Sequence, residues 1–328
     1  MKLSAIIFFL ITSTTGFTKE LTIYTSRKEH LIKPLIEQYT NETGIKFKLK
    51  TGKDGALIQS MIAEGDKTPA DILMTVDAGN LWFAKTQDLF APIKSDVLSK
   101  NIPEHLRDKN NYWFGLSIRA RTIVYHSGRI QPKEIKSYEN LANKKFNGKL
   151  CLRTSKKVYN QSLVSMLIHE LGVDKTKAVL KGWVDNNVKI FSSDTNLIKA
   201  ITAGQCDLGI VNTYYLARLQ KKDKNYPVKI YWPNQDSFGV HVNVSGAGVS
   251  KHSKNKKDAL KFIEWLSSKK AQSTFANTNL EFPVLKEAKK DSLTASWGSF
   301  KANSTFNLTK AGELQSTAIK LMQEVGYK

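Results

Sequence analysis

The sequence has little of what most enzymes display. It contains only six histidines and two cysteines in 328 residues, and the histidines are scattered without catalytic or metal-ligand spacing. It lacks a nucleophile elbow, a glycine-rich phosphate loop, a His-Glu-x-x-His helix and any prominent pair of carboxylates. These absences argue against catalysis, so we assign no catalytic residues. A secreted hydrolase remains an alternative.

Acidic residues are also scarce. The chain has 29 Asp and Glu against 50 Lys and Arg, which gives a formal net charge of +21. Such a surplus can indicate a nucleic-acid or membrane partner. Here the basic residues are spread along the whole chain, without a basic tail, an RNP-type aromatic motif or zinc-finger spacing. We therefore expect a soluble basic surface and no nucleic-acid partner.

Long apolar runs are missing as well. No segment after the N-terminus reaches the roughly 18 residues of a membrane span. Residues 1–18 have the features of a secretory signal: Lys2 is basic, residues 5–11 are apolar, and cleavage is expected after Gly16 or Thr18. No cysteine lies near the cleavage point, which argues against a lipoprotein anchor. We expect an exported, soluble mature protein.

The two cysteines, Cys151 and Cys206, suggest one disulfide in an exported protein. The bridge would close a loop of about 55 residues. By chain entropy it would be worth about 4 kcal/mol. Two buried free thiols are the alternative. A bridge would join the two predicted strands that lead into the tyrosine-bearing segments described below.

Strand and helix patterns alternate in the first part of the chain. The expected strands are 21–24, 46–50 and 71–76, and the expected helices are 31–41, 56–64 and 78–85. This order favours parallel strands with helices on both faces. Extended stretches at 113–117 and 119–125 then predict a crossing into a second lobe, with a hinge near Ser117 and Ile118.

The alternation restarts beyond that crossing. The expected strands are 150–153, 189–191 and 208–211, with helices at 161–171 and 196–203. Extended stretches at 228–232 and 240–243 predict the return crossing, and amphipathic helices follow at 257–270 and 311–325. The length also fits two lobes. The predicted fold is α/β, with two lobes, two crossing strands and a central cleft.

Tyrosines follow two of the predicted strands. Tyr214 and Tyr215 come after strand 208–211, where Asn212 and Thr213 resemble a helix N-cap. Tyr159 lies where the helix after strand 150–153 begins. Ligands of open α/β sheets collect beyond the carboxyl ends of strands. Phenolates are hard oxygen ligands that suit a trivalent metal, although a Tyr-Tyr pair can also simply pack one ring inward.

Several segments together resemble a known family. They are residues 24–27, 69–79, 115–121, 159–163, 212–215 and 239–246, which occur in order over nearly all of the mature chain. As a set they are similar to the periplasmic ferric-iron-binding proteins of ABC transporters, in their tyrosine-rich, FutA-like branch. The resemblance implies the fold of a type II periplasmic binding protein. It also implies a non-enzymatic, periplasmic and monomeric protein that carries Fe³⁺ to an inner-membrane permease. Alternatives on the same fold are a polyamine, thiamine or phosphate compound as ligand.

The resemblance also implies a metal site. Tyr159, Tyr214 and Tyr215 match the family's tyrosine ligands from one lobe. In the family pattern the first loop supplies His or Tyr from the other lobe, but Lys28 and Glu29 occupy those positions here. Additional candidate ligands are therefore Glu29 and His30, and the alternative is water or an anion such as carbonate. The candidate charge partners of the metal and anion are Arg27, Arg119 and Arg218.

The same reasoning divides the chain into parts. Residues 1–18 are the signal peptide. The first lobe is expected to comprise residues 19–117 and 240–285. The second lobe is expected to comprise residues 118–239 and 286–328. The boundaries come from the predicted hinge and the resemblance, because linker composition marks none of them.

Overall fold

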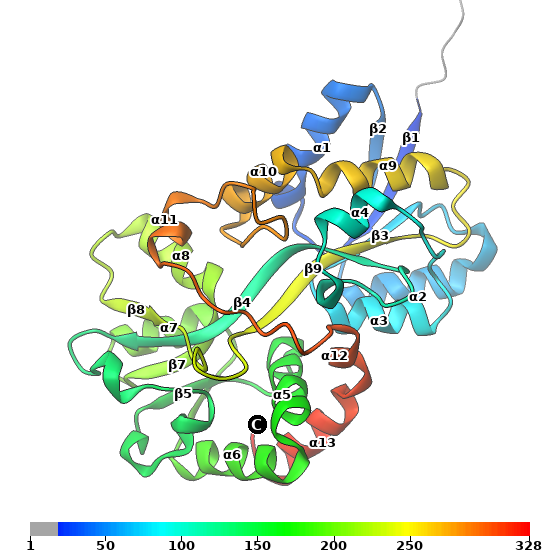
Figure 1. The fold of residues 1–328 in the computed structure, drawn as a ribbon. Helices are drawn as coiled ribbons and strands as arrows, with labels where there is room; N and C mark the ends of the chain where they lie inside the picture. The colour runs from blue at the N-terminus through cyan, green and yellow to red at the C-terminus, as the bar shows by residue number, and fades with distance from the viewer. Residues whose placement is uncertain (1–18) are drawn as a thin grey trace, which may run out of the picture.

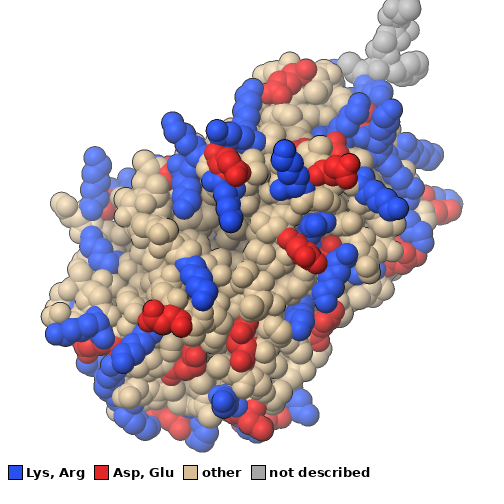
Figure 2. All heavy atoms as spheres, viewed as in Figure 1, with Lys and Arg blue, Asp and Glu red and all other residues tan. Residues whose placement is uncertain are grey.

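The computed structural model describes residues 19–328, which form two α/β lobes joined by long shared strands (Figure 1). The predicted signal peptide lies outside the described residues. Within residues 19–328, none of the helices has the length and apolar character needed to cross a membrane. Figure 2 shows Lys and Arg distributed over the visible face and interspersed with Asp and Glu, without one dominant basic patch.

The first lobe begins with the expected β-α-β-α-β order. Its elements are β1 (Glu20–Thr25), α1 (Glu29–Thr43), β2 (Lys46–Thr51), α2 (Asp54–Glu64), β3 (Ile72–Thr75) and α3 (Ala78–Thr86). Strand β1 pairs in parallel with β2 on one side and with β3 on the other. Helix α1 ends at Gly44, whose φ of 75° is left-handed and suits glycine. Asp77 caps α3 by accepting a hydrogen bond from Asn80 N.

Two strands cross between the lobes. They are β4 (Phe114–His126) and β9 (His241–Val249), which pair antiparallel along the centre of the molecule. The register of β4 shifts between Gly115 and Ser117, beside the predicted hinge. A short bridge between Ile118 and Phe282 adds a third link at this point. The prediction of two crossing strands is therefore confirmed.

One part of the predicted return crossing is wrong. Residues 228–231 form β8 (Val228–Tyr231), which pairs with residues 123–126 of β4 in the second lobe. Only β9 pairs both with β3 of the first lobe and with β4. An extended pattern alone does not show which neighbour a strand will have, so the two stretches looked equivalent in the sequence.

The second lobe repeats the strand-helix alternation. Its elements are β5 (Leu150–Arg153), α5 (Val158–Leu171), β6 (Lys189–Phe191), α7 (Asp194–Thr202), β7 (Leu208–Asn212) and α8 (Thr213–Lys222). Strand β5 lies parallel to β6 and β7, and β7 pairs with β4. The resulting sheet has nine strands in the order β2-β1-β3-β9-β4-β7-β5-β6, with β8 attached to β4.

The remaining helices cover the sheet and the hinge. The α-helices are α4 (Asp96–Asn101), α6 (Val173–Asp185), α9 (Lys256–Leu266), α10 (Lys269–Asn279), α11 (Ser292–Ser296), α12 (Thr309–Glu313) and α13 (Gln315–Glu324). The 3₁₀ turns are η1 (Gly65–Lys67), η2 (Glu104–Leu106), η3 (Pro132–Glu134), η4 (Glu139–Ala142) and η5 (Lys144–Phe146). Helix α12 contacts both α3 and α5, so it touches both lobes.

Two predicted helices have different bounds in the structure. The helix expected at 257–270 ends at Leu266, because the Ser268 side chain accepts a hydrogen bond from Ala271 N and starts α10. The helix expected at 311–325 is divided into α12 and α13 around Leu314. Amphipathic spacing continued across both breaks, so periodicity alone did not reveal them.

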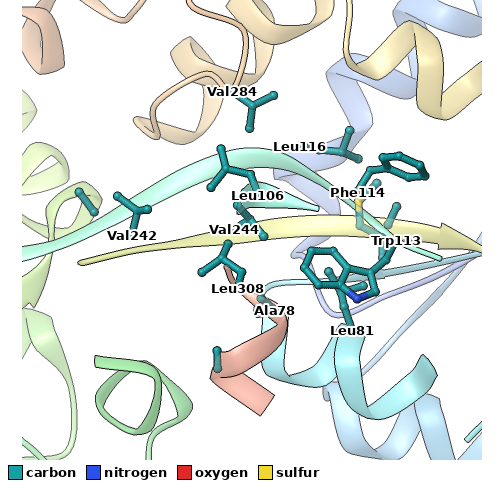
Figure 3. Packing of buried hydrophobic residues seen from close by; sticks show 14 of the residues in the cluster. Ala78, Leu81, Leu106, Trp113, Phe114, Leu116, Val242, Val244, Val284 and Leu308 are labelled. Atoms are coloured by element: carbon teal, nitrogen blue, oxygen red, sulfur yellow. The ribbon is translucent and has the colours of Figure 1, made fainter. Parts of the chain in front are cut away.

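The hydrophobic core surrounds the crossing strands (Figure 3). Trp113 and Phe114 are fully buried near Leu81 and Val244. The strands approach closely here, since a Cβ on Gly246 would lie 2.5 Å from Phe114 O. Any larger residue at Gly246 would force the strands apart. The core thus holds the start of β4 against the second half of β9.

The predicted disulfide is present. Cys151 of β5 is bonded to Cys206, which precedes β7, and their Cα atoms are 6.0 Å apart. Both side chains are buried. The bridge ties the two strands whose carboxyl ends carry the tyrosines.

Candidate metal centre

Three tyrosines gather at one edge of the second lobe's sheet. Tyr159 is the second residue of α5, and Tyr214 and Tyr215 lie in the first turn of α8. The preceding strands, β5 and β7, are parallel neighbours, so their carboxyl ends open at the same edge. This is why residues 55 positions apart in the chain share one site.

The phenol rings line a small cavity between the lobes. Its volume is about 140 Å³. The lining residues are Ser26, Arg27, Lys28, Leu31, Val76, Arg119, Tyr159, Tyr214, Tyr215 and Arg218. The first five belong to the first lobe, Arg119 lies on the crossing strand, and the others belong to the second lobe. All three tyrosines are candidate site residues from the sequence, as are three of the four cations that line this cavity, with Lys28 the exception.

The tyrosine pair is packed tightly. Tyr214 is 3% exposed, and its ring centroid lies 4.3 Å from that of Tyr215. Asn212 Nδ2 donates a hydrogen bond of 3.2 Å to the Tyr214 oxygen. Burial raises the pKa of Tyr214 well above its usual value of 10.0, while the charge of Arg119 acts in the opposite direction. A metal bound here would have to displace the proton of a buried phenol.

Guanidinium groups surround the phenols. Arg119 lies 5.1 Å from the Tyr214 ring centroid, and its Nη1 is 3.5 Å from the Tyr159 oxygen. Arg218 lies 5.0 Å from the Tyr214 ring centroid and 5.8 Å from that of Tyr215. Positive charges at these distances stabilise phenolates. The two arginines therefore act against the effect of burial and favour the deprotonated form of the tyrosines.

Arg153 is a member of this cluster that the sequence analysis missed. Its guanidinium lies 5.3 Å from the Tyr159 ring centroid and 6.0 Å from that of Tyr215. Asp194 Oδ2 lies 3.5 Å from Arg153 Nη1. Arg153 is the last residue of β5, the strand before Tyr159. Residues at the carboxyl end of such a strand lie at the edge of the sheet where ligands bind, and this position could have identified Arg153 in the sequence.

Arg27 reaches the cavity as part of a buried ion-pair network. Its Nη2 lies 3.0 Å from Glu281 Oε2, and Glu281 Oε1 lies 3.0 Å from Arg119 Nη2. Arg27 Nη1 also donates to Asn279 at 2.6 Å. Burial alone would raise the pKa of Glu281, but Arg119 and Arg27 outweigh it and hold the pKa at about 2. Glu281, which the sequence analysis also missed, thus remains ionised and fixes both arginines.

The first loop contributes a cation to the cavity. Lys28 lines the cavity next to Arg27. Glu29 begins α1, and both Glu29 and His30 are exposed and absent from the cavity lining. Within residues 19–328, no cluster of three or more His, Cys, Asp or Glu side chains is suited to holding a metal ion.

Other hollows on the described part of the chain differ in chemistry. A surface cavity of about 480 Å³ is lined by residues of the first lobe such as Lys48, Asp71 and His252. None of its described lining residues is a tyrosine. The cavity between the lobes is smaller, but it alone combines phenols with several guanidinium groups among the described hollows.

Two α/β lobes, crossing strands and a polar cavity at the hinge define a binding protein that closes around a small solute. The chain belongs to the bacterial extracellular solute-binding proteins, whose family description matches residues 34–302. It is 40% identical to "Iron uptake protein A1" of Synechocystis sp. over 325 residues, which cover 97% of this chain and 90% of that protein. It is also 40% identical to "Iron uptake protein A2" of the same organism, over 83% of this chain and 81% of that one.

Solved structures agree with this assignment. The Trichodesmium FutA (IdiA) structure, described as a complex with iron and citrate ligands, superposes with a TM-score of 0.89 at 41% identity. The superposition covers 94% of this chain and 100% of that chain. Apo FutA2 from Synechocystis superposes with a TM-score of 0.88 at 36% identity, over 95% and 100% of the two chains.

Proposed function

We propose that this protein captures ferric iron in the periplasm and delivers it to the permease of an ABC transporter. The observation that carries the proposal is the convergence of Tyr159, Tyr214 and Tyr215 on one cavity between the lobes. The names of the similar proteins, "Iron uptake protein A1" and a FutA complex with iron, support the same cargo. Binding and transfer require no catalysis by the protein.

The chemistry of the donors favours Fe³⁺. Phenolate oxygens are hard, charged ligands and match a hard trivalent cation. Three phenolates balance the charge of one ferric ion, which limits the cost of burying it. Arg119, Arg153 and Arg218 add positive charge around the phenol rings, and this favours the deprotonated ligand set. The divalent ion gains less from the same donors because its charge is lower.

The first-lobe wall of the cavity contains the cations Arg27 and Lys28, whereas the resemblance implied a metal donor from the first loop. We therefore assign the remaining coordination positions to water or to a small anion such as carbonate or a carboxylate. Lys28 and Arg218, which face the cavity from opposite lobes, are the groups that would bind such an anion. The citrate in the Trichodesmium FutA structure supports a carboxylate in this role.

The same arrangement disfavours the alternative cargoes. A polyamine or thiamine is cationic and would meet Arg27, Lys28, Arg119 and Arg218 in the cavity. A phosphonate would suit those cations. One relative, a "Putative 2-aminoethylphosphonate-binding periplasmic protein" of Salmonella typhi, is 26% identical over 76% of this chain. A phosphonate ligand would leave the three phenols without a role, so ferric iron explains more of the site.

Delivery follows from lobe closure. The arginines of the first lobe and crossing strand meet the anionic ligand set around the cargo when the cleft closes, so the cargo stabilises the closed form. A monomeric carrier, exported with its signal peptide removed, then presents this form to the permease. Mass measurement of the periplasmic protein would establish the cleavage position.

Competition binding tests the proposal. The purified mature protein is titrated with ferric iron in the presence of a chelator of known affinity, with and without carbonate or citrate. We expect saturable ferric binding at one site, tighter with the anion present, and little binding of spermidine, thiamine or 2-aminoethylphosphonate. Tight phosphonate binding with no ferric binding would refute the proposal.

A further inference from the structure

The two tyrosine-bearing turns share a buried arginine behind the cavity. Arg121 lies two residues after Arg119 on β4 and is fully buried. Alternate residues of a strand point to the same face. Both arginines therefore lie on the face of β4 that is directed toward the tyrosine-bearing turns. Arg119 contacts the phenol rings, whereas Arg121 contacts the backbone and the asparagine side chains of those turns.

One arm of Arg121 holds the turn of Tyr159. Its Nη2 donates to Asn160 Oδ1 at 2.6 Å. The amide of Asn160 in turn donates to Arg153 O at 2.5 Å and to Thr154 O at 3.1 Å. These bonds close the loop from the end of β5 to the first turn of α5. Since Asn160 follows Tyr159 directly, these hydrogen bonds fix the direction in which the Tyr159 side chain points from the first turn of α5.

Both terminal nitrogens of Arg121 also hold the turn of Tyr214. Arg121 Nη1 donates to Asn212 Oδ1 at 3.3 Å, and Nη2 donates to Ile210 O at 3.2 Å. With its oxygen engaged by Arg121, the Asn212 amide presents its Nδ2 to the Tyr214 oxygen at 3.2 Å. The guanidinium thus determines which end of the Asn212 side chain faces the phenol.

A single carboxylate completes the cluster. Asp194 Oδ2 accepts from Arg121 Nη1 and from Asn212 N, each at 3.3 Å. It also lies 3.5 Å from Arg153 Nη1. Two buried guanidinium groups share this one carboxylate, so a net positive charge remains behind the phenols. That charge favours an anionic ligand set at the cavity.

We propose that Arg121 is a positioning residue that preassembles the three-tyrosine half of the iron site in the second lobe before the cleft closes. Its planar fork reaches both turns at once, which a lysine cannot do. Arranging ligands in advance removes an ordering cost from binding. The expected effect on iron affinity rests on the proposed function. The rigidity of the two turns, in contrast, can be measured by hydrogen exchange without iron.

Arg121→Lys and Arg121→Met test the proposal in the mature protein. We expect amide hydrogen exchange in the iron-free protein to rise at residues 154–160 and 212–216. The tyrosinate-to-iron absorption band should shift, and ferric affinity should fall roughly 10- to 100-fold, as is usual for groups that orient metal ligands. The matched control is Arg129→Lys, because Arg129 also binds backbone carbonyl groups of the second lobe but lies away from the cavity.

A lower melting temperature with unchanged exchange at both turns and an unchanged absorption band would overturn the proposal, because Arg121 would then serve stability alone. If wild-type protein gives no ferric band at all, the proposed function fails, and the exchange data still decide the role of Arg121.

A second variant covers the case in which Arg121 substitutions do not fold. The buried Tyr327 donates to Arg153 O at 2.7 Å and accepts from Asn160 Nδ2 at 2.8 Å. Tyr327→Phe should therefore raise exchange at residues 154–160 but not at 212–216, and should shift the band. Tyr231→Phe on β8 is its control. Unchanged exchange and an unchanged band in Tyr327→Phe would contradict the proposed network.

Discussion

The carboxylate of Glu281 lies 3.0 Å from a guanidinium nitrogen of Arg119 and 3.0 Å from one of Arg27. This joins the first loop, the crossing strand β4 and the segment after α10 at the hinge. All three side chains are buried, so each charge depends on its partners. Arg119 is held in place by Glu281 while its other side faces the tyrosines.

The network predicts a pH dependence of stability. The pKa of Glu281 is lowered to about 2 in the folded protein from the ordinary 4.5. The ionised Glu281 therefore adds about 3 kcal/mol to the free energy of unfolding. This stabilisation is fully present above pH 4.5 and is lost as pH falls through about 2. Urea unfolding of wild type and Glu281→Gln between pH 7 and 2 measures it. We expect the difference in unfolding free energy to shrink in that acid range, and a constant difference would contradict the assignment.

Removal of Arg153 should weaken iron binding. Arg153→Gln deletes a charge 5.3 Å from the Tyr159 ring centroid, so the anionic ligand set is less stabilised. We expect roughly tenfold weaker ferric binding, or about 1.4 kcal/mol, measured by chelator competition. Arg129→Gln, which breaks an ion pair with Asp207 outside the cavity, should leave the affinity unchanged. Equal effects of the two substitutions would show that no specific role belongs to Arg153.

The first loop should tolerate loss of its carboxylate. Glu29 is exposed and does not line the cavity, so Glu29→Ala should change ferric affinity by less than roughly tenfold, or about 1.4 kcal/mol. Lobe closure, followed by small-angle scattering, should also survive. A loss as large as that of Tyr215→Phe would mean that the first lobe supplies a direct ligand.

The disulfide should stabilise the second lobe. The bond between Cys151 and Cys206 closes a loop with a sequence separation of 55, which is worth about 4 kcal/mol by chain entropy. A thiol reagent should label no residue in the denatured, unreduced protein and two after reduction. The denaturation midpoints of the oxidised and reduced forms measure how much the disulfide stabilises the folded state. Labelling without reduction would exclude the bridge in the exported protein.

Much of the framework could be predicted from the sequence, because buried strands and their turns leave local signals. Strands β5 and β7 appear as short apolar runs, and Tyr159 and Tyr214 follow them within a few residues. Strand pairing is harder to infer, so β8 was wrongly assigned to the return crossing. The break between α9 and α10 was also missed, since the Ser268 cap interrupts a continuous apolar stripe.

The carboxylates that hold the arginines of the site could not be recognised from nearby residues in the sequence. Glu281 binds Arg27 across 254 positions of the chain, and Asp194 binds Arg121 across 73. Such pairs depend on the packing of distant elements, which a single sequence does not reveal. The phenols were recognisable from their motif, whereas the charges that orient them required the fold.

Absorption spectroscopy during ferric titration tests the central claim most directly. We predict a visible tyrosinate-to-iron charge-transfer band in wild-type protein. Tyr159→Phe, Tyr214→Phe and Tyr215→Phe should each weaken or shift it, because each removes one phenolate. Tyr231→Phe, outside the cavity, should leave it unchanged. A colourless wild-type protein at saturating ferric iron would contradict the tyrosinate site.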